Sequence, residues 1–179
     1  VIDLPGTYSL SAISVEELIA RNYIIKEKPD VVIHVVDACS LERNLYLTLQ
    51  LMELTDKLVI ALNKVDLAKK NGILVDSKKL SKMLGLPVVE TVATEGKGLK
   101  KLLEVCLKVA EGRIKTKPLK VLYGELEKFI TQLEERVEIK GYDRRWVSIK
   151  LLEKDEEILR MVDKKTKSIL KRLKEISKD

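Results

Sequence analysis

The chain has 179 residues, of which 45% are hydrophobic and 35% charged, and this balance excludes a disordered polypeptide. No apolar run approaches the roughly 18 residues of a membrane span, and one His with two distant Cys excludes zinc knuckles, disulfide scaffolds and His-based triads. The net charge of +6 is concentrated in residues 164–178, with seven basic side chains and one acid. Such a run is typical of a solvated helix face, and it also fits an acidic membrane surface or nucleic acid.

Strand and helix patterns alternate over the first two thirds of the chain. Short apolar runs predict three strands and the end of a fourth, at 31–36, 58–62, 87–91 and Val1-Ile2. Helical periodicity and capping residues predict four helices, at 14–26, 41–54, 77–84 and 99–110. This alternation predicts an α/β fold with a mostly parallel sheet and helices on both faces.

The pattern changes near Lys115-Thr-Lys-Pro118, after which only helices are expected. Their predicted ranges are 119–137, 144–152 and 155–176. We therefore expect two domains, a sheet domain over 1–115 and a small all-helical domain over 116–179. The helical part is too short for a large core of its own, so we expect Trp146 to pack against the sheet domain.

Asn63-Lys64-Val65-Asp66 follows directly on the predicted strand 58–62. An Asp at the carboxyl end of a parallel strand can accept hydrogen bonds from guanine N1–H and its exocyclic amine, a donor pair that adenine lacks. The Asn side chain would support the loop, and the Lys stem would lie along the base. Taken alone, the four residues are equally consistent with a polar turn.

Asp3-Leu-Pro-Gly6 also follows the end of a predicted strand. The Asp3 carboxylate can hold Mg²⁺, usually through a water molecule, and the backbone N–H of Gly6 can approach a γ-phosphate because glycine has no Cβ. Taken alone, Pro5-Gly6 is more typical of a simple turn.

The third segment, Val92-Ala93-Thr94, follows the predicted strand 87–91. A small residue there lets a backbone N–H reach guanine O6. The three segments occur in the order and at the strand ends expected of a P-loop GTPase, and this constellation is far more specific than any one of them.

Several longer segments resemble one family, the ferrous iron transport protein B (FeoB) family. They are Asp3–Leu10, Pro29–Ala38, the Leu-rich segment Leu41–Leu51 and the helical segment Tyr142–Leu152. The last two are the specific ones, because the nucleotide motifs are shared by many GTPases. The resemblance covers nearly the whole chain in order.

The resemblance implies a cytosolic GTPase domain and a helical domain that precede the membrane part of a Fe²⁺ transporter. It implies GTP/GDP and Mg²⁺ as cofactors and the cytoplasmic face of the membrane as the location. It assigns guanine binding to Asn63, Lys64, Asp66 and the segment Val92–Thr94. It assigns the phosphate side to Asp3, Gly6 and Thr7, with Asp3 as the Mg²⁺ residue. Its implied partners are the guanine nucleotide, the transporter's own membrane domain and an anionic membrane surface at Lys164–Lys178, with no nucleic acid.

The family's first motif, Gly-x-x-x-x-Gly-Lys-Ser/Thr, is not among these residues, nor is the switch I segment. Because that loop supplies most of the phosphate cradle, we expect this chain by itself to bind GTP poorly and to be inactive. Thr7 stands where Ras-like enzymes have a Gln that orients water, and no residue is assigned as a catalytic base. Val92 stands where the family often has Ser.

Two other classes remain open from the sequence. The basic helical region also fits a ribosome- or RNA-associated GTPase, for which strong salt-dependent RNA binding would be diagnostic. A non-enzymatic regulatory module with relic GTPase motifs is the second alternative. We expect His34 to be a satisfied core histidine rather than a metal ligand, and Cys39 to be a buried, unreactive thiol.

Overall fold

The computed structural model describes residues 1–11, 14–163 and 166. Its centre is a parallel three-stranded sheet in the order β1-β2-β3, formed by Val32–Asp37, Leu58–Asn63 and Val88–Thr91. The register pairs Asp37 with Asn63 and Asn63 with Thr91, so the last residues of the three strands lie in one row. This row is the carboxyl edge of the sheet, where ligands bind in open α/β folds.

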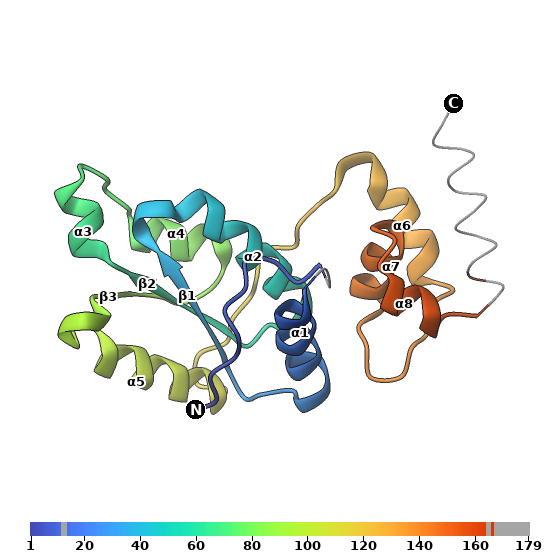
Figure 1. Cartoon of the computed structure of the whole chain (residues 1–179), viewed down its shortest axis with the longest axis horizontal. Helices are drawn as coiled ribbons and strands as arrows, with labels where there is room; N and C mark the ends of the chain where they lie inside the picture. Colours follow the sequence, from blue (N-terminus) through green and yellow to red (C-terminus); the bar gives the residue numbers. More distant parts are fainter. Residues whose placement is uncertain (12–13, 164–165, 167–179) are drawn as a thin grey trace.

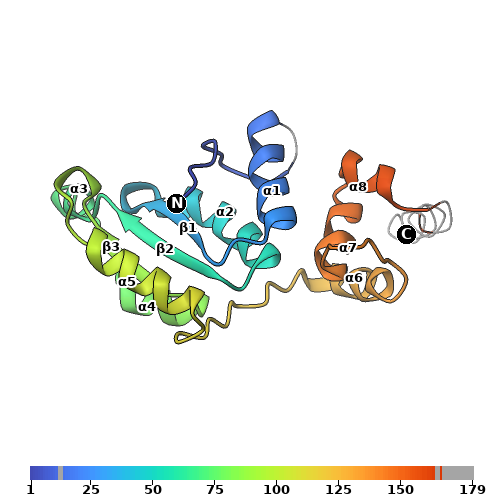
Figure 2. The same cartoon turned by 90° about the horizontal axis from the view of Figure 1, so that it is seen from below.

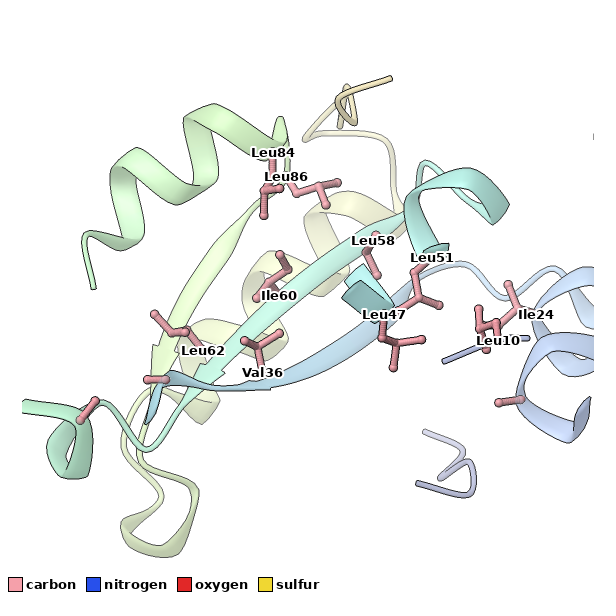
Figure 3. Packing of buried hydrophobic residues seen from close by; sticks show 13 residues of the cluster. Leu10, Ile24, Val36, Leu47, Leu51, Leu58, Ile60, Leu62, Leu84 and Leu86 are labelled. Atoms are coloured by element: carbon pink, nitrogen blue, oxygen red, sulfur yellow. The ribbon is translucent and has the colours of Figure 1, made fainter. Parts of the chain in front are cut away.

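Helices cover both faces of the sheet, as the alternation predicted (Figures 1 and 2). One face packs against α1, α2, α3 and α4, which span Val15–Glu27, Leu41–Leu54, Val65–Lys70 and Ser77–Leu84. The other packs against α5, Leu99–Ala110. Alternate residues of β2 point to opposite faces, so Leu58, Ile60 and Leu62 join the first core while Val59 and Ala61 join the second. Figure 3 shows the first of these cores.

Local sequence explains where these helices begin and end. Ser14 and Glu17 form the predicted capping box at the start of α1, and Asp76 caps α4 by accepting a hydrogen bond from the backbone of Lys79. Gly85 ends α4 in the left-handed conformation, where an added Cβ would lie 1.9 Å from a backbone oxygen. The short helix α3 was not predicted, because its six residues carry no full amphipathic period.

The helical part contains α6 (Glu127–Glu134), α7 (Arg144–Leu152) and α8 (Glu156–Met161), with a 3₁₀ turn at Gly124–Leu126. These helices enclose a core that includes Phe129, Leu133 and Trp146. In both cartoon views this part lies at the opposite end of the molecule from α3 (Figures 1 and 2).

Three predicted elements differ in the structure. Val1 and Ile2 are exposed and lie outside the sheet, since no described strand pairs with them. The helix expected from residue 119 begins only at the 3₁₀ turn, because the backbone of Lys117 and Leu119 donates hydrogen bonds to the carbonyls that end α4. The helix expected over 155–176 stops at Met161, where Val162 is extended; most of its remainder lies outside the described residues.

A buried ion pair joins the two parts of the chain. Arg21 of α1 donates to Asp155 at 2.5 Å and also to Glu157, and its side chain is 1% exposed. The guanidinium lies over the ring of Trp146, 5.5 Å from the ring centre. Trp146 therefore packs against the sheet domain, as expected from the sequence. A second link runs from the Tyr123 hydroxyl, which donates to Glu53 of α2.

Candidate nucleotide site at the carboxyl edge of the sheet

Asn63, the last residue of β2, holds two neighbouring segments together. Its Oδ1 accepts a hydrogen bond from the Thr91 hydroxyl at 3.2 Å and from the backbone N–H of Ala93 at 3.0 Å. Because β2 and β3 are parallel and in register, the amide stands directly beside the loop that leaves β3. Asn63 thus fixes the Val92–Thr94 segment against the end of β2.

Lys64 lies next along the chain, in the left-handed conformation with φ of 59°. Its ammonium donates to Asp37 at 2.6 Å, across the gap between the ends of β2 and β1. This hydrogen bond lowers the pKa of Asp37 and raises the pKa of Lys64. The side chain of Lys64 is therefore charged and drawn along the carboxyl edge toward β1.

Asp66 lies in the first turn of α3 and is half-buried. The pKa of Lys97 is raised by its hydrogen bond with Glu95, and Asp66 adds a smaller attraction in the same direction. Asp66 therefore lies within electrostatic reach of the loop that follows β3.

The loop after β3 is closed by a bridge between Val92 and Lys97, whose backbones exchange two hydrogen bonds. Gly98 ends the loop at φ of 79°, and an added Cβ would lie 2.1 Å from the Glu90 oxygen, so only glycine fits. Ala93 and Thr94 are exposed at its tip. The Ala93 N–H is engaged by Asn63, whereas the Thr94 N–H has no protein acceptor within the described residues.

The predicted phosphate-side residues belong to a separate stretch. Asp3 and Gly6 are exposed, and Thr7 donates from its hydroxyl to the Ser9 carbonyl at 2.6 Å. The stretch is anchored at its far end, where the backbone of Leu10 donates to Gln50 of α2 at 2.7 Å. In Figure 1 it runs from the N-terminus toward α2 and α1, away from α3.

Within the part of the chain that the structure describes, no hydrogen bond or ion pair joins this stretch to Asn63, Lys64 or Asp66. The structure thus brings the guanine-side residues together and leaves the phosphate-side residues apart from them. The reason is that Val1 and Ile2 form no ladder with β1, so nothing holds Asp3 at the row of strand ends.

The described residues contain no group of three His, Cys, Asp or Glu side chains that could hold a metal ion. Asp3 by itself offers the kind of oxygen ligand that Mg²⁺ prefers, but a site there would need phosphate oxygens and water to complete it. Asp3 can thus supply one ligand of a Mg²⁺ site, but the described residues do not form a complete site.

Two further residues lie at this edge: Asp37, to which the sequence assigned no role, and Thr91, the end of the predicted strand 87–91. Asp37 ends β1 opposite Asn63, and its Oδ1 also accepts the backbone N–H of Cys39 at 2.8 Å. Its position directly after an apolar strand was the available signal. His34 is buried as expected, with the Thr48 hydroxyl at 3.0 Å. Cys39 is half-buried rather than buried, and its pKa is raised, chiefly by desolvation.

Comparison with known families identifies the chain. A family model described as ferrous iron transport protein B matches residues 1–106, and one described as the FeoB cytosolic helical domain matches residues 123–179. The chain belongs to the FeoB family. The resemblance seen in its sequence is thereby confirmed, and so is the expected fold of a parallel α/β sheet followed by helices.

Relatives in the FeoB family are much longer. An Fe(2+) transport protein A/Fe(2+) transporter FeoB fusion protein of Porphyromonas gingivalis is 44% identical over 94% of this chain and 21% of its own length. The Fe(2+) transporter FeoB of Escherichia coli K12 is 39% identical over 87% of this chain and 21% of its own. The chain spans about a fifth of these curated relatives. No helix in the described residues is long and apolar enough to cross a membrane.

Solved FeoB structures have the same fold. The FeoB G-domain from Methanococcus jannaschii is 54% identical and covers 62% of this chain and 70% of its own, with a TM-score of 0.60. The GDP form II of the T. maritima FeoB cytosolic domain is 32% identical, covers 99% of this chain and 78% of its own, and has a TM-score of 0.83. An S. thermophilus NFeoB bound to mGMPPNP has a TM-score of 0.82 at 34% identity, over 99% of this chain and 70% of its own.

Proposed function

We propose that this chain forms the guanine-nucleotide-binding part of an Fe²⁺ transporter and that the complete protein hydrolyses GTP there. The observation that carries the proposal is the hydrogen bond from the Ala93 backbone to Asn63, which fixes the loop Val92–Thr94 to the end of β2, with Lys64 and Asp66 following Asn63 in the chain at the same sheet edge. The names of its relatives support it, since they include FeoB cytosolic domains with GDP and with mGMPPNP. The matched relatives are named as iron transporters, which gives no support to an RNA-associated GTPase or a relic module.

The proposed roles follow from what each group can donate or accept. Asp66 accepts the two guanine donors, the Lys64 stem lies along the base, and Asn63 positions the loop. Because the Ala93 N–H already serves Asn63, the Thr94 N–H is the group we assign to guanine O6. Val92 supports this loop through its bridge to Lys97.

On the phosphate side, we assign Asp3 to a Mg²⁺-bound water and the backbone of Gly6 to the γ-phosphate, with Thr7 between them and the anchor at Leu10. These groups orient phosphate oxygens, and the bound metal supplies charge stabilisation. The cradle motif Gly-x-x-x-x-Gly-Lys-Ser/Thr is not among the 179 residues. We therefore propose that the chain alone binds nucleotide weakly and does not turn it over.

We also propose the larger setting. Residues 1–115 form the nucleotide domain and 116–179 the helical domain, which lie at the cytoplasmic face of the membrane next to the transporter's membrane domain. The basic segment Lys164–Lys178 is assigned to anionic lipid; apart from Thr166 it lies outside the described residues. We assign the segment Asp3–Ser14 as a switch that responds to the nucleotide. Nucleotide state would reach the helical domain through α1, which directly follows this segment and carries Arg21.

The test is a titration with fluorescent GDP, in the presence of Mg²⁺, on this chain and on the complete gene product that contains it. We expect GTP to compete and ATP not to compete. Asp66→Asn should lose GDP binding and gain binding of xanthosine diphosphate, because an amide can donate to the xanthine C2 carbonyl where the carboxylate accepted from the guanine amine.

Asp30→Asn is the matched control, since it makes the same charge change at an exposed position just before β1. It should leave both affinities unchanged. ATP competing as well as GTP, or Asp66→Asn keeping full GDP affinity, would show that the edge does not read guanine.

A further inference from the structure

Asp37 belongs to none of the nucleotide motifs, yet it contacts Lys64 at the centre of one. Its two carboxylate oxygens have different tasks. Oδ1 accepts the backbone N–H of Cys39, which caps the 3₁₀ turn Ala38–Ser40, and Oδ2 accepts the ammonium of Lys64 at 2.6 Å. The carboxylate is half-buried, with 27% of its side chain exposed.

The capping hydrogen bond restricts the Asp37 side chain to one orientation. Oδ1 binds a backbone N–H only two residues farther along the chain, and all six residues of β1 pair with β2. The turn is packed as well, because its Ala38 and Ala68 of α3 are 1% and 2% exposed in the same core. A fixed carboxylate gives the mobile end of a lysine one preferred position.

Lys64 needs such a position because its backbone does not restrict its long side chain. It is the only residue between β2 and α3, it adopts a left-handed conformation, and 53% of its side chain is exposed. A free lysine at that point would sample many rotamers, and ordering it upon binding would cost free energy. Held by Asp37, the stem is drawn across the ends of β1 and β2 before any nucleotide arrives.

We infer that Asp37 is a positioning residue for nucleotide binding: it holds Lys64 so that the lysine stem forms a preorganised floor for the base. The inference rests on the proposed function of this edge. By this inference β1, which has no nucleotide motif of its own, contributes to the affinity of the site for the guanine base. Asp37 acts through Lys64 and does not itself contact the nucleotide.

A double-mutant cycle in GDP affinity tests this, using the complete gene product that contains these residues. Asp37→Asn keeps an oxygen for the Cys39 N–H but places an amide against the lysine. We expect GDP affinity to fall about two- to fivefold, the range of an exposed ion pair. Lys64→Met keeps an apolar stem without the charge, and in that background Asp37→Asn should change affinity by less than about 1.5-fold.

Additive effects of the two substitutions would overturn the inference, because they would mean that Asp37 acts only by capping its turn. Asp30→Asn should have no effect in either background. A second readout needs no nucleotide: acetylation of the Lys64 amine, followed by mass spectrometry, should be faster in Asp37→Asn than in the unaltered protein. An equal rate would also overturn it, whereas an unaltered protein that binds no GDP would instead overturn the proposed function.

Discussion

Because this chain has a single histidine, the dependence of its folding stability on mild acid can be traced to one side chain. His34 lies in the middle of β1, is 7% exposed, and contacts the Thr48 hydroxyl of α2 at 3.0 Å. Burial lowers its pKa from 6.5 to about 4, because the charged ring would lose its hydration inside the core. The perturbation we consider is mild acid.

The sign follows from which state binds the proton. Between pH 6.5 and pH 4 the unfolded chain has a protonated histidine and the folded chain does not, so acid stabilises the unfolded state. Stability is fully present above pH 6.5, falls as the pH drops, and levels off for this group below about pH 4. The two pKa values correspond to a loss of about 2 kcal/mol between pH 7.5 and pH 5.

Urea unfolding at pH 7.5, 6 and 5, followed by the fluorescence of Trp146, measures this loss. His34→Asn removes the titrating ring and keeps an amide that can reach Thr48, so its unfolding free energy should be nearly independent of pH above 5. Because every other titrating group is common to the two proteins, the difference between them at each pH isolates the histidine. If the variant lost as much stability as the unaltered chain, the burial argument would be refuted.

Two further substitutions test packing, each against a matched control. Arg21→Met should lower the free energy of unfolding by about 3–5 kcal/mol, because it leaves Asp155 buried without its cation. Arg160→Met removes an exposed pair and should cost under about 0.5 kcal/mol in the same urea titration. Gly98→Ala should cost about 2 kcal/mol or more, since its Cβ would strike a backbone oxygen of β3, whereas Gly96→Ala, with similar φ and open space, should cost about 1 kcal/mol. Equal losses within either pair, measured by thermal or urea unfolding, would contradict the geometry.

The bounds of five helices were predicted to within a residue or two. The ranges 41–54, 77–84, 99–110 and 144–152 are the helices of the structure, and α1 spans Val15–Glu27 instead of 14–26. Such boundaries depend on residues within one turn of each other, so they are visible in the sequence. The wrong helix start at residue 119 had a distant cause, since its backbone donors are taken by carbonyls some 30 positions earlier.

For the guanine-side candidates too, local features could be predicted from the sequence and contacts between distant segments could not. Asn63, Lys64 and Asp66 are neighbours in the chain, and an apolar strand before them indicates a sheet edge, so their grouping was predictable. That Asn63 binds the Ala93 backbone, leaving Thr94 as the loop's available N–H, depends on the register of β2 against β3. The Asp37–Lys64 pair depends likewise on the register of β1 against β2.

The sequence by itself determined the family, the alternation of strands and helices, and the chemistry of the motif residues, because each depends on a few adjacent side chains. Only the tertiary structure decided which of those residues meet. Parallel strands from distant segments align Asp37, Asn63 and Thr91 in one row, whereas Asp3 stays apart because no described strand pairs with the residues before it. The burial of Arg21 between α1 and the helical part of the chain is likewise a property of packing, since an arginine in an amphipathic helix is otherwise expected at the surface.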